Sequence, residues 1–178
     1  MEITSTAQNT SQSQNSETNI IFTFPFPTSV NESLCAIGGR LVKTSKARAF
    51  LTKAINRAAV DPIFREYKKY IKQWIDDKNT LRVDCYYIWP KSRLFTDPDN
   101  KKAKHFVRQI DASNRTKQLH DALAQIFDVD DMYFFAGDTE KIYDEKYKDY
   151  EIEPYCIIKI TPHIPRSVNE LKEELNLK

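Results

Sequence analysis

The stretch "IDASNRTKQLHDALAQIFDVDD", residues 110–131, decides which fold class the chain can adopt. If Ser113 to Phe127 form a helix, the large apolar side chains gather on one side, because residues three and four apart are neighbours there. The members of this stripe are Leu119, Ala122, Leu123, Ile126 and Phe127. A stripe this wide must be buried, which predicts a helix packed against a sheet.

The segments around this helix have the composition and alternation of β-strands. "TLRVDCYYIWP" (80–90) alternates Leu81, Val83, Cys85 and Tyr87 with more polar residues. After the helix, "MYFFAG" (132–137) and "EPYCIIKITPH" (153–163) predict two more strands. Near the start, residues 20–24 predict a strand that ends where prolines 25 and 27 interrupt regular pairing.

The remaining segments predict helices and turns. Residues 45–77 have helical periodicity, with Pro62 opening a second helix. Gly38-Gly39 predicts a turn, residues 91–109 a polar loop, and Ser167 to Glu170 the capping box of a short terminal helix. This order of elements predicts an α+β domain in which a small mixed β-sheet is packed with helices.

Length and composition limit the organisation and the function. The 178 residues suit one domain, residues 18–178, preceded by a Ser/Thr/Gln/Asn-rich segment, 1–17, that we expect to be disordered. A net charge of +2 does not by itself indicate nucleic-acid binding. The three cysteines are scattered and the histidines lack metal-ligand spacing, so we expect no zinc site. We expect no membrane span and no signal peptide, and therefore a cytoplasmic protein.

The far end of the helix in residues 110–131 is unusually acidic. Asp128, Asp130 and Asp131 follow it where the helix dipole is negative, so these carboxylates repel the dipole and one another. A bound divalent cation would relieve that repulsion. The alternative is a solvated helix in which Asp111 or Ser113 caps the N-terminus and Lys117 pairs with Asp121. The residues alone leave both interpretations open.

A known family has the same pattern. Asp111-x-Ser113-Asn114-x-x-Lys117-x-x-x-Asp121, followed by Asp130-Asp131, resembles the RusA family of Holliday junction resolvases. "FPFPTSVN" (24–31) and "GGRLVKTSKARAF" (38–50) resemble earlier segments of that family, and the similarity covers about residues 20–161. The resemblance implies a RusA-like homodimer: a Mg²⁺-dependent endonuclease of DNA recombination and repair that cuts four-way junctions and is commonly carried by prophages.

The resemblance also implies roles for particular residues. Asp111 and Asp131 would be metal ligands and, with Lys117, catalytic residues. Ser113, Asp121 and Asp130 would be further candidates for the metal. Ser113 stands where the family has an aspartate and supplies no negative charge, so weaker metal binding is expected. The alternative is a catalytically weakened homologue that binds branched DNA without cutting it.

The segment before the helix, residues 91–109, is basic. In the family the corresponding segment is basic and lies near the site. Because basic side chains on a loop can bind several DNA phosphates in a salt-dependent way, we expect DNA binding by Lys91, Arg93, Lys101, Lys102, Lys104 and Arg108. Its "DPDN" (97–100) has the family's Asp-x-Asp-Asn, but Ala103 and Val107 stand where Lys and Asp are required, so we interpret it as a turn. A third interpretation, a Mg²⁺-dependent nucleotide phosphohydrolase, is disfavoured because the chain has no Gly-rich phosphate loop.

Overall fold

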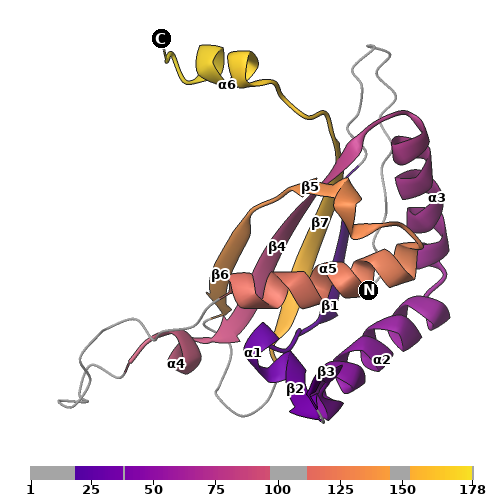
Figure 1. Cartoon of the computed structure of the whole chain (residues 1–178), viewed down its shortest axis with the longest axis vertical. Coiled ribbons are helices and arrows are strands. Elements are labelled where there is room, and N and C mark those ends of the chain that lie inside the picture. Colours follow the sequence, from indigo (N-terminus) through magenta and orange to yellow (C-terminus); the bar gives the residue numbers. More distant parts are fainter. Residues whose placement is uncertain (1–18, 38, 97–111, 145–152, 178) are drawn as a thin grey trace, which may run out of the picture.

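The structure is a computed structural model that describes residues 19–37, 39–96, 112–144 and 153–177. The predicted tail (1–17), the "DPDN" turn and Asp111 lie outside these residues. In the described part, a mixed sheet forms the centre and helices pack against it (Figure 1). The predicted α+β class is confirmed.

The sheet has the strand order β1-β7-β4-β5, with β6 also paired to β4. The strands are β1 (Ile20–Pro25), β4 (Thr80–Pro90), β5 (Phe134–Ala136), β6 (Thr139–Asp144) and β7 (Tyr155–His163). β7 is antiparallel to β1 and β4, whereas β5 and β6 run parallel to β4. Cys156 faces Phe24 on one side and Tyr87 on the other, which aligns the buried side chains of three strands.

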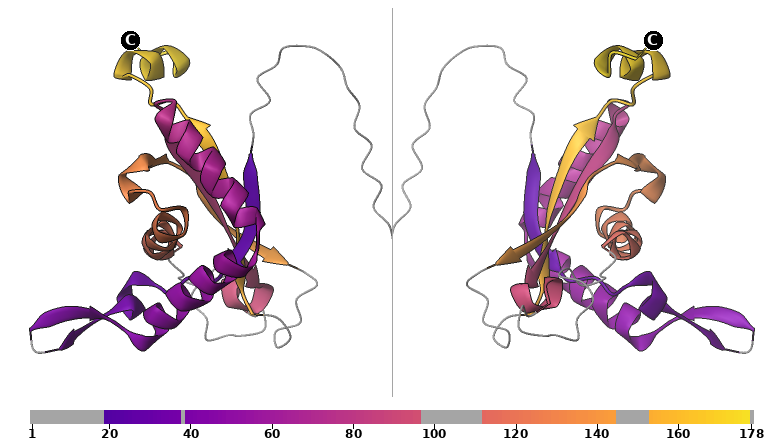
Figure 2. Two further views of the ribbon diagram at one scale, coloured as in Figure 1. Left: turned by 90° about the vertical axis from the view of Figure 1, so that its right-hand side faces the viewer. Right: turned by 90° about the vertical axis from the view of Figure 1, so that its left-hand side faces the viewer.

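One face of the sheet is covered by α5 (Ser113–Phe127), with α2 (Ser45–Val60) and α3 (Ile63–Asp76) beside it (Figure 2). The core joins alternate residues of the strands to the apolar stripe of α5. Its buried members from β4 and α5 are Leu81, Val83, Cys85, Tyr87, Trp89, Leu119, Ala122, Leu123 and Phe127. The structure therefore confirms that the stripe of α5 packs against the sheet, with Ile126 at its half-buried margin.

Two four-residue helices and a β-hairpin lie in segments for which the sequence pattern predicted no regular element. α1 (Val30–Ser33) leads into the hairpin of β2 (Leu34–Ile37) and β3 (Arg40–Lys43). α4 (Lys91–Leu94) occupies the start of the predicted polar loop, which is a correction. Four-residue helices carry too little periodicity to be recognised in a sequence.

The segment predicted as one strand, "MYFFAG", is divided in the structure. Residues Asp131–Tyr133 form the 3₁₀ turn η1, and only Phe134–Ala136 pair with β4 as β5. Gly137 then passes so close to β4 that an added Cβ would lie 2.0 Å from the carbonyl oxygen of Val83. Buried Asp84 accepts a hydrogen bond from the amide of Asp138 (3.0 Å) and directs the chain into β6. The sequence pattern missed β6, because "TEKIYD" is a largely exposed edge strand.

The C-terminal helix α6 (Val168–Glu174) has the predicted capping box at Ser167 and Glu170. It lies away from the sheet and has no buried residue (Figure 1). The helix boundary predicted at Pro62 is also confirmed, since α2 ends at Val60 and α3 begins at Ile63.

Candidate metal and nuclease site

Helix α5 presents its polar face away from the sheet. Lys117 is exposed and Asp121 is half-buried one turn further along. The predicted pair between them is not what the structure shows, because Asp121 lies 3.8 Å from the ammonium group of Lys43 on β3. Ala112 holds the N-cap position of α5, with no side-chain hydrogen bond there, so Ser113 is the first helical residue and not the cap; the predicted cap by Asp111 lies outside the described residues. The acid on the polar face of α5 is thus paired with a lysine of β3, and Lys117 is exposed to solvent.

The three acids after α5 have different environments. Asp128 ends the helix in the left-handed conformation (φ 58°) and lies 3.2 Å from Nζ of Lys68. Asp130 caps η1 by accepting a hydrogen bond from the amide of Met132 (3.0 Å). Asp131 is exposed, and within the described residues its carboxylate accepts no hydrogen bond. An ion pair therefore accounts for the position of Asp128, and capping accounts for that of Asp130. Asp131 is the acid whose oxygens are available for a ligand.

His120, the residue before Asp121, packs against the segment that follows Asp131, and no sequence pattern assigned it a role. Its ring packs edge-on against Phe134 (5.1 Å between centroids), and its buried Nε2 has no hydrogen-bond partner in the described part. Burial lowers the pKa of His120, while the charges of Asp131 and Asp121 oppose that shift. Asp121 on α5 and Asp131 on η1 therefore act on one and the same side chain. The only sequence signal was its position beside Asp121.

Two further residues of α5 hold the "FPFP" segment in place. The guanidinium group of Arg115 donates a hydrogen bond to the carbonyl oxygen of Pro27 (2.7 Å) and lies over the ring of Phe26. Burial lowers the pKa of Arg115. Gln118 is buried and accepts a hydrogen bond from the hydroxyl group of Thr28. Sequence reasoning missed both, since contacts between residues so far apart in the chain leave no local pattern.

The structure leaves part of the predicted site outside the described residues. Asp111 and the basic residues Lys101, Lys102, Lys104 and Arg108 belong to that part, and nothing is described of the Ser113 side chain. Lys91 and Arg93 are exposed on α4, with Nζ of Lys91 5.5 Å from the ring centroid of Tyr143. Among described residues, no group of three His, Cys, Asp or Glu side chains is placed to hold a metal ion. No described helix has the length and apolarity that crossing a membrane requires.

The family model for the endodeoxyribonuclease RusA matches residues 25–155. The chain belongs to the RusA family. The match extends from the end of β1 to the first residue of β7, so it includes Pro25 to Pro27, α5 and the acids that follow it. RusA-family proteins are endodeoxyribonucleases that resolve Holliday junctions. α6 lies beyond the matched region. No individually curated protein matches this chain.

Proposed function

We propose that this RusA protein is a Mg²⁺-dependent homodimeric endonuclease that cuts four-way DNA junctions in recombination and repair. The observation that carries the proposal is the packing of His120 on α5 against Phe134, which brings the helix that carries Asp121 beside the segment that follows Asp131. Lys117 lies on the same helix, exposed and one turn before Asp121. An exposed carboxylate, a second acid and an exposed lysine together suit a phosphodiester substrate.

The donor set suits Mg²⁺ among divalent cations. This ion prefers oxygen ligands and keeps several waters, so one or two carboxylates are sufficient. In this proposal Asp131 and Asp111 would hold the ion, and Ser113, Asp121 and Asp130 are the further candidate ligands. When bound, the ion orients a water molecule for in-line attack and offsets the charge that develops on the phosphate. Asp130 can cap η1 with one oxygen and still offer the other.

Residues of the chain would do the remaining work. Lys117 contributes a positive charge to the phosphate as negative charge accumulates there, a contribution that belongs to the transition state. Lys91 and Arg93, with Lys101, Lys102, Lys104 and Arg108, bind the DNA backbone in a salt-dependent way. Two-fold symmetry of a homodimer would present one site to each of two equivalent strands of a junction.

The main alternative is a RusA protein that binds branched DNA and cuts it poorly, and Ser113 is the residue that favours it. Ser113→Asp tests the ligand position directly. If Ser113 stands at that position, the added carboxylate should shift the metal dependence of cleavage to lower Mg²⁺ concentrations. Lower activity of the variant at every Mg²⁺ concentration would show that another acid already completes the site.

The proposed activity is tested by incubating the protein with a synthetic four-way junction in Mg²⁺ or in EDTA. We expect paired cuts near the crossover in Mg²⁺, binding without cleavage in EDTA, and no cleavage of a linear duplex of the same sequence. A nucleoside triphosphate is added in a separate reaction. Its hydrolysis, with the junction left intact, would support a nucleotide phosphohydrolase and contradict the proposal.

A further inference from the structure

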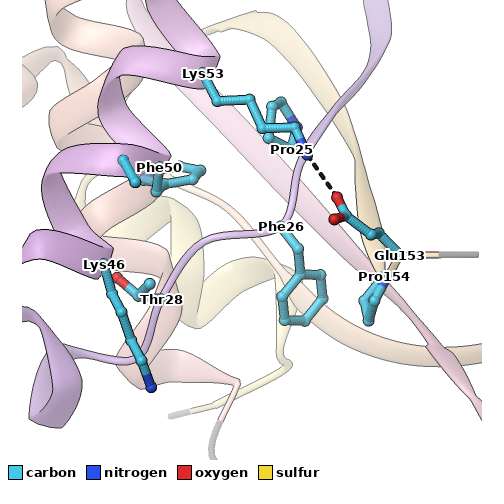
Figure 3. Close-up of a pocket in the computed structure, with 9 residues that line it drawn as sticks. Pro25, Phe26, Thr28, Lys46, Phe50, Lys53, Glu153 and Pro154 are labelled. Carbon is cyan, nitrogen blue, oxygen red and sulfur yellow. Dashed lines mark hydrogen bonds and ion pairs between the residues drawn. The ribbon is translucent and has the colours of Figure 1, made fainter.

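A pocket of about 470 Å³ lies between α2 and the segment before β7 (Figure 3). Its volume is within the range of about 300–1,000 Å³ that is usual for small-molecule sites. Pro25 at the end of β1 and Phe26 and Thr28 after it lie between the two walls, and Glu153 and Pro154 form the wall opposite α2. The α2 wall consists of Lys46, Ala49, Phe50 and Lys53. The pocket therefore combines an aromatic ring with ammonium groups.

The ring of Phe26 is fixed by its neighbours. It packs edge-on against Trp89 (4.4 Å between centroids) and Tyr87 (5.7 Å), and Arg115 lies 5.0 Å from its centroid. These contacts hold the ring without burying it, since Phe26 is only partly buried and lines the pocket. A planar aromatic ring held in this way is a platform on which a nucleobase can stack.

The charges of the pocket suit phosphate groups. Residues 33–60 contain six Lys and Arg residues and no Asp or Glu, whereas the whole chain has a net charge of only +2. Lys53 is paired with Glu153 (2.6 Å) and Lys46 with Glu32 (3.6 Å), and all four side chains are about half exposed or more. Exposed ion pairs are weak, so a phosphate can replace either carboxylate as the partner.

We propose that this pocket binds one unstacked nucleotide of a DNA substrate, with the base on Phe26 and the flanking phosphates on Lys46 and Lys53. The pocket would give the protein a preference for DNA with an unpaired base, such as one released when a base pair beside a crossover opens. This inference rests on the proposed action on DNA, but it does not require that the DNA be cut.

The pocket is joined directly to α5. Thr28 lines the pocket and donates its hydroxyl hydrogen bond to Gln118, the residue after Lys117. Arg115, two residues before Lys117, contacts Phe26. A base seated on Phe26 would therefore lie one side chain away from the helix that carries the candidate catalytic lysine.

The test uses the whole protein in EDTA and two duplexes, one fully paired and one with a short unpaired tract that contains 2-aminopurine. The wild type should bind the unpaired DNA more tightly and change the 2-aminopurine fluorescence on binding. Phe26→Leu should lose that change and about tenfold of the preference, as expected for one base–aromatic stack. Lys46→Gln/Lys53→Gln provides a second variant at exposed positions, where folding is not at risk. It should also weaken the preference, whereas Lys69→Gln on α3 should not.

An unchanged fluorescence response in Phe26→Leu, or equal weakening of both duplexes by the lysine variant, would overturn the inference. Junction cleavage in Mg²⁺ is measured in parallel with the same proteins. If the wild type cuts the junction but shows no preference for unpaired DNA, the inferred role of the pocket is wrong and the proposed function stands. A preference that depends on Phe26, in a protein that cuts nothing, would support the pocket and contradict the nuclease.

Discussion

The guanidinium group of Arg115 on α5 hydrogen-bonds the carbonyl oxygen of Pro27, 88 residues earlier in the chain (2.7 Å). The same group lies 5.1 Å from the ring centroid of Trp89 on β4. One side chain thus joins the first RusA motif, the sheet and the helix that carries Lys117. Two separate family motifs are brought together by a contact that neither of them reveals alone.

Replacing Arg115 by Met keeps most of the side-chain volume and removes the donor. We expect Arg115→Met to lower the free energy of unfolding by about 1–3 kcal/mol, the usual range for a hydrogen bond made by a charged group. Chemical denaturation measures the change. Arg48→Met at an exposed position of α2 is the matched control and should change stability by less than about 0.5 kcal/mol. Equal effects of the two substitutions would mean that Arg115 has no structural role.

Gly137 should tolerate no side chain, because a Cβ there would meet the backbone of β4. The nearest atom, the carbonyl oxygen of Val83, would be 2.0 Å away and cannot rotate aside. Gly137→Ala should therefore lower stability by about 3 kcal/mol or more, at the upper end of overpacking effects. Gly39→Ala is the control: its φ of 77° is unfavourable for alanine but the space is open, so a loss of about 1 kcal/mol is expected. Similar losses would contradict the close approach.

The three cysteines should differ sharply in reactivity. Burial raises the pKa of Cys85 to about 12, and Asp84 adds to the shift; burial also raises the pKa of Cys156 well above its ordinary value. A raised pKa keeps both groups as unreactive thiols at about pH 8. Cys35 is half-buried in β2. A thiol-specific reagent should modify one cysteine in the native protein and all three after denaturation, and Cys35→Ser should remove the native reaction. Rapid modification of two thiols in native protein would contradict this packing.

Lys117 should affect the rate of cleavage more than binding. A charge that acts on the phosphate as negative charge accumulates stabilises the transition state selectively. We expect Lys117→Met to reduce the single-turnover rate by about 100-fold or more, with less than about a threefold change in junction affinity. Lys69→Met, an exposed lysine of α3, is the control and should change neither. Parallel losses of rate and affinity in Lys117→Met would identify it as a general phosphate contact.

The sequence predicted the structure well where a pattern of apolar residues repeats over a long segment. The stripe of α5, the alternation in β4 and the break at Pro62 each follow from local geometry, and the structure confirms them. β6 was missed because an edge strand is exposed and needs no apolar alternation. Its position depends on Gly137 and buried Asp84, which are contacts between segments and have no local signature.

The environment of the candidate site residues was not predictable from the sequence. Family resemblance proposed Lys117, Asp121 and Asp131 as site residues, whereas the ion-pair partner of Asp121 came only from the structure. Lys43 takes the place that Lys117 was expected to fill beside Asp121, because the chain brings the end of β3 within ion-pair distance of α5. The repulsion of acids at the end of α5 is relieved in part by Lys68 and by capping, which one helix considered alone could not indicate.

The most direct test of the metal-site account is a Mg²⁺ titration of junction cleavage by Asp131→Asn and Asp128→Asn. The substitutions are isosteric and remove the same charge from neighbouring positions, and both side chains are exposed. The account predicts that Asp131→Asn loses cleavage by about 100-fold or more with junction binding retained, whereas Asp128→Asn cuts like the wild type. Unimpaired cleavage by Asp131→Asn across the titration would contradict it.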